Sequence, residues 1–133
     1  MRKIFNHTVL CVLLAFSNSV FSADLEGRQK YQEAFHENTI RVLSSMTAED
    51  TTIEAQANKF TSCHMGALDY YSPELQKAAF DIILEGGSYA DAKMAFDTAL
   101  AAESSAGGEK FEKIQQMYLG AATFGKQCLG MNQ

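Results

Sequence analysis

The chain of 133 residues has no tryptophan and a single proline, and it is poor in the residues from which β-sheets are built. Beyond residue 22, valine occurs only once, as Val42, whereas alanine occurs 17 times. Strands favour β-branched and aromatic residues, while alanine, leucine, glutamate, glutamine and lysine favour helices. No segment alternates apolar and polar residues with period two, as a half-buried strand does. These absences argue against a sheet and predict an all-α fold.

Basic side chains are also scarce, with 11 Lys and Arg against 16 Asp and Glu and a formal net charge of −5. A protein that binds nucleic acid without regard to sequence needs a basic face. Negative charge likewise disfavours an anionic membrane surface. We therefore expect no nucleic-acid partner and no membrane association of the folded domain. The length allows one ordinary domain, and no repeat or linker divides it.

The N-terminal segment has the three parts of a secretory signal peptide: a basic start with Arg2 and Lys3, an apolar run over 9–16, and mostly small or polar residues over 17–22. A membrane anchor is the alternative, but the apolar stretch of about eight residues falls far short of the roughly 20 that span a bilayer. We expect cleavage after Ser22. The product is a single domain of residues 23–133 with net charge −7, periplasmic or secreted.

Apolar residues recur at helical spacing in five later segments that are separated by turn residues. The expected helices cover residues 25–46, 51–71, 73–85, 89–103 and 109–128. Ser72 and Pro73 have the pattern of a capped third helix, and Gly86 the pattern of its end. Ser88 and Asp91 have the spacing of a capping box. Short connections between five helices predict a compact antiparallel bundle.

The helical spacing also predicts which large side chains face the core. They are Tyr31, Phe35, Val42, Leu43, Met46, Ile53, Phe60, His64, Leu68, Tyr71, Tyr89, Phe96, Leu100, Phe111, Ile114, Met117, Tyr118 and Phe124. Two glycines in the last helix, Gly120 and Gly125, mark either the close approach of a neighbouring helix or a weak point.

Two cysteines, Cys63 and Cys128, remain when Cys11 leaves with the signal peptide. An even number of cysteines in an exported domain predicts a disulfide. Its loop of about 65 residues corresponds to on the order of 4 kcal/mol in the chain-entropy description. A redox-active thiol or a metal site is the alternative, but no C-x-x-C pair supports it. We predict a structural disulfide.

Three residues are candidate metal ligands: Glu33, His36 and His64. Glu33 and His36 have the Glu-x-x-His spacing of metal sites in helix bundles, but a di-iron site needs a second copy, which the chain lacks. A mononuclear site requires His64 to meet the other two across two helices. Haem held by Met and His is a related alternative, without the covalent C-x-x-C-H motif. We favour an exposed helix face for Glu33 and His36, a core-edge position for His64, and no cofactor.

Two adjacent tyrosines, Tyr70 and Tyr71, follow Asp69 at the end of the second helix. We expect one to pack inward and the other to lie at the surface, where tyrosine with an acidic rim suits protein recognition. The alternative is that both pack against a neighbouring helix. No G-x-S-x-G motif or other catalytic constellation indicates an enzyme.

We therefore predict an exported binding module with a protein partner, of the inhibitor, immunity, chaperone or accessory type. The alternative is a carrier of a small apolar ligand, haem or metal between helices. If His36 and His64 lie close together, the carrier is favoured. If they lie apart, the protein binder is favoured.

Mass spectrometry before and after reduction tests the disulfide. We expect a peptide that joins Cys63 to Cys128 in the non-reduced protein and two separate peptides after reduction. Two free thiols before reduction would contradict the pairing.

Overall fold

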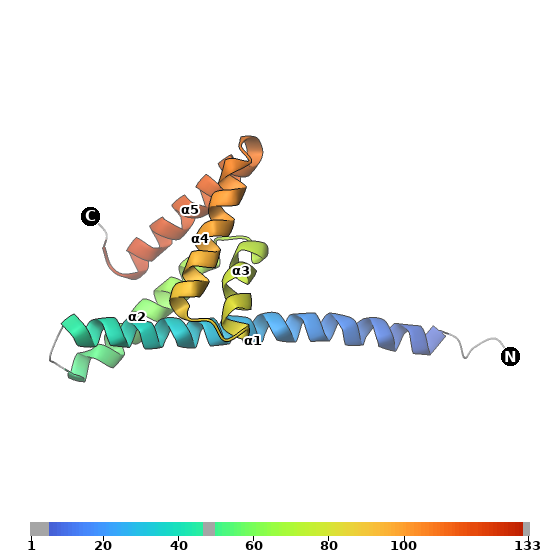
Figure 1. Cartoon of the computed structure of the whole chain (residues 1–133), viewed down its shortest axis with the longest axis horizontal. Helices are drawn as coiled ribbons and strands as arrows, with labels where there is room; N and C mark the ends of the chain where they lie inside the picture. The colour runs from blue at the N-terminus through green and yellow to red at the C-terminus, as the bar shows by residue number, and fades with distance from the viewer. Residues whose placement is uncertain (1–5, 47–49, 132–133) are drawn as a thin grey trace.

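The computed structural model describes residues 6–46 and 50–131, and the regular structure in these ranges is entirely helical. The helices are α1 (Asn6–Met46), α2 (Asp50–Leu68), α3 (Pro73–Leu84), α4 (Tyr89–Ser105) and α5 (Gly108–Cys128). Helix α1 is a long rod that packs on α2, α3 and α4, whereas α5 packs on α2 and α4 (Figure 1). The predicted all-α bundle is confirmed. None of the helices in the described ranges combines the length and the apolar character needed to cross a membrane.

The start of α1 differs from the sequence prediction, because the helix begins at Asn6 and not near residue 25. No proline or glycine lies between Asn6 and Gly27, so nothing in the sequence ends the helix there. Side chains 24–26 are exposed, and Gly27 is buried against Phe80 of α3. The N-terminal part of α1 runs beyond the other helices (Figure 1). The division of the chain after residue 22 stays a prediction.

Capping fixes both ends of the turn between α3 and α4, as predicted. Gly86 has φ +90°, which closes α3 in the left-handed region that favours glycine. The Ser88 hydroxyl accepts a hydrogen bond from the Asp91 N–H at 3.1 Å, and the Asp91 carboxylate accepts one from the Ser88 N–H at 3.0 Å. At the start of α3, the Ser72 hydroxyl accepts from Leu75 N–H at 3.4 Å. These caps position α4 against α3.

The core is small and rich in alanine, and its main cluster joins four helices. The buried members are Tyr31, Met65, Leu68, Ala79, Phe80 and Ala92. Because alanines lie where α3 and α4 meet, the helix backbones approach closely. The same small residues leave little apolar volume, so contacts outside the core carry more of the stability.

Five residues expected in the core are exposed instead: Val42, Met46, Phe60, Phe111 and Tyr118. Val42 and Met46 lie in the last turns of α1, and Phe111 in the first turn of α5, where a helix has neighbours on fewer sides. Beside Phe60, the buried position is taken by Thr61. The apolar spacing was therefore right about the helices but wrong about these five side chains.

The disulfide between Cys63 and Cys128 ties the middle of α2 to the end of α5, as predicted. The two Cα atoms are 5.6 Å apart, and 65 positions separate the residues in the chain. A link over so long a loop removes much of the conformational freedom of the unfolded chain. It also anchors α5 to α2 near the C-terminus.

Two glycines continue this contact between α2 and α5. A Cβ on Gly66 of α2 would lie 2.5 Å from Cε1 of Phe124, and a Cβ on Gly120 of α5 would lie 2.6 Å from Cδ1 of Tyr70. Each glycine thus accepts an aromatic ring of the other segment. Gly120 marks a close approach, whereas Gly125 has open space around its Cα. We call the disulfide and these two contacts the α2–α5 seam.

Alanine substitutions test the seam. Overpacking a tight contact costs about 1–3 kcal/mol, whereas alanine in place of glycine gains about 1 kcal/mol at an open helix position. We expect the free energy of unfolding to fall for Gly66→Ala and to rise for Gly125→Ala, measured by urea unfolding. Equal effects of the two substitutions would show that the Phe124 ring moves aside without cost.

Candidate functional site

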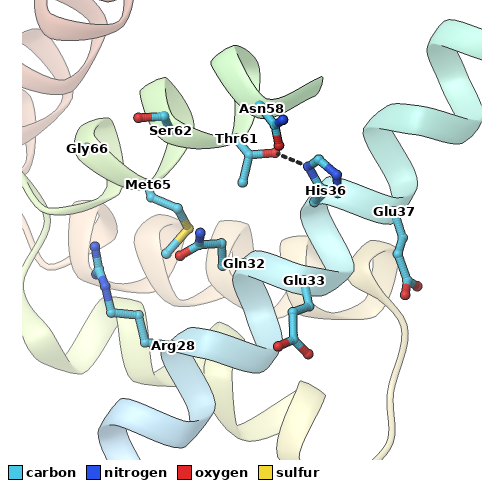
Figure 2. Close-up of a pocket in the computed structure, with 10 residues that line it drawn as sticks. All are labelled: Arg28, Gln32, Glu33, His36, Glu37, Asn58, Thr61, Ser62, Met65 and Gly66. Atoms are coloured by element: carbon cyan, nitrogen blue, oxygen red, sulfur yellow. Dashed lines mark hydrogen bonds between the residues drawn. The ribbon is translucent and has the colours of Figure 1, made fainter. Parts of the chain in front are cut away.

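Two hollows of different chemistry lie on either side of α2. The first is a polar groove of about 600 Å³ between α1 and α2, with Glu33 and His36 among its lining residues (Figure 2). The second is an aromatic cavity of about 260 Å³ between α1, α2, α4 and α5, with His64 and Tyr71 in its walls. The predicted candidate ligands are therefore divided between two places.

In the groove, His36 reaches from α1 to Thr61 of α2 (Figure 2), and its second ring nitrogen also has a partner on α2. Nδ1 lies 3.2 Å from the Thr61 hydroxyl, and Nε2 lies 3.1 Å from a carboxylate oxygen of Glu54. Thr61 is buried, and this contact gives its hydroxyl a polar partner. His36 thus fastens the two helices to each other.

Glu33 does not join His36, although the two have the spacing of a metal motif. Its carboxylate points away from the His36 ring (Figure 2) and accepts a hydrogen bond from the side-chain amide of Gln29 at 3.1 Å. Glu33, His36 and His64 are not brought together. Across the part of the chain that the structure describes, no three His, Cys, Asp or Glu side chains cluster in a way that could hold a metal ion.

Arg28 lies at one end of the groove, and no motif in the sequence pointed to it. Its guanidinium forms an ion pair with Asp69 at 2.7 Å and donates to the side-chain oxygen of Gln76 at 3.4 Å. The ion pair joins α1 to the turn after α2, and the hydrogen bond joins it to α3. Such contacts depend on the register between helices, which a single sequence does not reveal.

His64 lies on the cavity side of α2, in a core-edge position. Its ring stacks on Phe35 with centroids 3.9 Å apart, and Nε2 lies 2.8 Å from the Tyr31 hydroxyl. Burial lowers the pKa of His64 to about 4, so the imidazole is neutral at pH 7. Burial also raises the pKa of Tyr31. The phenol of Tyr31 therefore stays protonated, and its O–H can donate a hydrogen bond to the neutral imidazole of His64.

The two adjacent tyrosines take different environments. Tyr71 is half-buried in a wall of the cavity, with its ring edge-to-face to Phe96 at a centroid distance of 5.0 Å. Tyr70 keeps 47% of its surface exposed, although its ring lies against Gly120 and 5.7 Å from the ring of Phe124. One tyrosine thus faces the cavity and the other faces solvent.

Three further aromatic side chains complete the cavity: Tyr89 and Phe96 from α4 and Tyr118 from α5. At its edge, Lys93 and Asp97 form an ion pair one helical turn apart. The sequence analysis predicted that these aromatic side chains face the core. Helical spacing identifies the inward face of each helix, but it does not show that four such faces leave a cavity between them. The cavity could therefore not be predicted from the pattern of any single helix.

Comparisons with family models, with curated proteins and with solved structures find no match for this chain. Function is therefore inferred from the geometry of the groove, the cavity and the exposed surface.

The buried imidazole predicts a pH dependence of stability. The folded protein holds His64 neutral down to about pH 4, whereas an unfolded chain protonates histidine near pH 6.5. The stabilisation is therefore complete above pH 6.5 and declines as the pH falls toward 4, by about 3 kcal/mol in total. Urea unfolding at several pH values measures this decline.

Two variants separate His64 from the other titrating groups. His64→Phe keeps an aromatic ring against Phe35, and we expect it to flatten the decline between pH 6.5 and 4. His36→Gln serves as the control and should keep the part of the decline that comes from His64. An unchanged pH dependence in His64→Phe would contradict the assignment.

Proposed function

We propose that this protein is an exported binding module whose partner is another protein. The observation that carries the proposal is the placement of Tyr70, a large aromatic side chain that is held in position and yet 47% exposed. Tyrosine is enriched among the residues that dominate protein interfaces, because its ring buries a large area and its hydroxyl can hydrogen-bond.

The fixed position of Tyr70 favours binding. Its ring packs over Gly120 and beside Phe124, so folding has already restricted its rotation. Binding normally costs about 0.5–1.5 kcal/mol for each flexible side chain that becomes ordered at an interface. A side chain that is ordered beforehand avoids most of this cost.

Tyr70 follows an ion-paired aspartate in the chain, and its ring packs on a glycine that adjoins an exposed leucine. The neighbouring Asp69 carboxylate is exposed and paired with Arg28, and Leu119 of α5, next to Gly120, is 62% exposed. An exposed aromatic ring with apolar and charged neighbours has the composition of an interface core and its polar rim.

Export is part of the proposal, and the disulfide supports it. Disulfides persist in oxidising compartments such as the periplasm and the extracellular space, and are rare in the cytosol. Because side chains 24–26 of α1 are exposed, cleavage after Ser22 would leave the contacts from Gly27 onward in place. Residues 1–22 fit a signal peptide on this basis.

Affinity capture from the cell envelope of the source organism, followed by mass spectrometry, tests the proposal. We expect a specific protein with the unmodified chain and with Phe111→Ser, which removes an exposed ring elsewhere on α5. Tyr70→Ser should reduce recovery about tenfold or more, as expected for an interface residue worth about 2 kcal/mol. Failure to capture any protein, together with a co-purifying small molecule or metal, would overturn the proposal.

A second candidate, a carrier of a small ligand, is favoured by the aromatic cavity. The separation of His36 and His64 removes the support for a metal or haem held by both, since each has partners of its own. A cavity between helices that is lined by aromatic side chains and a few polar groups is a common form of ligand site.

A further inference from the structure

We propose that the aromatic cavity binds the ammonium head of a small soluble organic cation, through cation–π contacts with its tyrosine and phenylalanine rings and through the carboxylate of Asp97. This inference rests on the second candidate function, the small-ligand carrier, and does not depend on Tyr70 or on a protein partner.

The cavity has room for such a group. Its volume is about 260 Å³, whereas an apolar cavity of about 150 Å³ in another protein already admits benzene. It lies between α1, α2, α4 and α5, so that a ligand would be enclosed on several sides. A compact head group fits such a space better than an extended chain does.

Five of the residues that line the cavity are tyrosine or phenylalanine, whose rings are electron-rich. Tyr71 and Phe96 meet at 87°, and Tyr31 and Tyr89 at 56° with centroids 5.8 Å apart. Rings at steep angles to one another line more than one side of the space. The faces of aromatic rings carry negative potential and attract cations within about 6 Å, and sets of such rings are the usual binding sites for quaternary ammonium groups.

Charges of both signs lie at the cavity, and the negative one can attract a cation. Burial raises the pKa values of Tyr71 and Tyr89; the negative charge of Asp97 adds to both shifts, whereas the positive charge of Lys93 opposes the shift of Tyr89. The fields of both charged groups therefore reach the ring walls. His64 stays neutral at pH 7 and does not repel a positive ligand.

Lys93 is the cation that competes for Asp97, since the two form an ion pair. Both side chains are more than half exposed, at 59% and 53%. Exposed pairs of this kind contribute only about 0–1 kcal/mol. An ammonium group held by several rings can replace the lysine at the carboxylate, which leaves the lysine in solvent.

Titration with choline and with its uncharged analogue 3,3-dimethylbutan-1-ol tests the proposal, because the two differ mainly in the positive nitrogen. We expect choline to bind the purified protein about tenfold more tightly, with chemical-shift changes at Tyr71 and Phe96. Equal affinity for the two compounds would show that the cavity is merely apolar and would overturn the proposal. Absence of choline binding at millimolar concentration would also overturn it, even if the protein sediments with phosphatidylcholine vesicles.

Matched variants locate the site. Asp97→Asn should weaken choline binding several-fold and leave the neutral analogue unaffected, whereas Asp81→Asn breaks the similar Lys77–Asp81 pair on α3 and should change neither. Tyr118→Leu removes a ring that is 59% exposed, so the fold should persist while choline binding falls. Phe111→Leu is its control on the same helix. Unchanged choline binding in both Asp97→Asn and Tyr118→Leu would exclude this cavity as the site.

Discussion

The α2–α5 seam is the contact on which the rest of the structure depends. The core is small and alanine-rich, and the other main contact of α5 is with α4. Along the seam, positions 63, 66 and 70 of the chain face 128, 124 and 120. The spacing of three or four residues keeps 63 and 66 on one face of α2 and 120, 124 and 128 on one face of α5, while 70 lies in the turn that follows α2. The cavity needs this seam, because α5 supplies Tyr118 and one of its walls.

Helix α2 contacts α1, α5 and the main core at once, because its consecutive residues point about 100° apart. Cys63 is bonded to α5, His64 contacts Tyr31 and Phe35 of α1, and Met65 belongs to the main core cluster. A run of cysteine, histidine and methionine suggests a metal site when it is read as a string. On a helix the same run divides its side chains among three environments.

The sequence predicted what depends on local chemistry. Composition indicated the all-α class, Ser88 with Asp91 indicated a cap, and the even number of cysteines indicated the disulfide. The exposed Tyr118, the pair of Arg28 with Asp69 and the aromatic cavity could not be predicted in this way. Each depends on the register and depth at which helices meet, and an amphipathic stripe records only the direction of the inward face. For the same reason, the Glu-x-x-His spacing of Glu33 and His36 matched a metal motif, although the fold brings no third ligand to them.

Both proposed sites use the same short segment at the end of α2. Tyr71 lines the cavity while Tyr70, the next residue back, is exposed to a partner. Their backbone belongs to one turn, in which the Tyr70 and Tyr71 N–H groups donate to the carbonyls of Ala67 and Leu68. A ligand that moves Tyr71 therefore acts on the segment that presents Tyr70. If ligand changes the affinity for the partner by some factor, the partner must change the affinity for ligand by the same factor. If both proposals hold and the turn transmits the movement, this reciprocity couples the two sites.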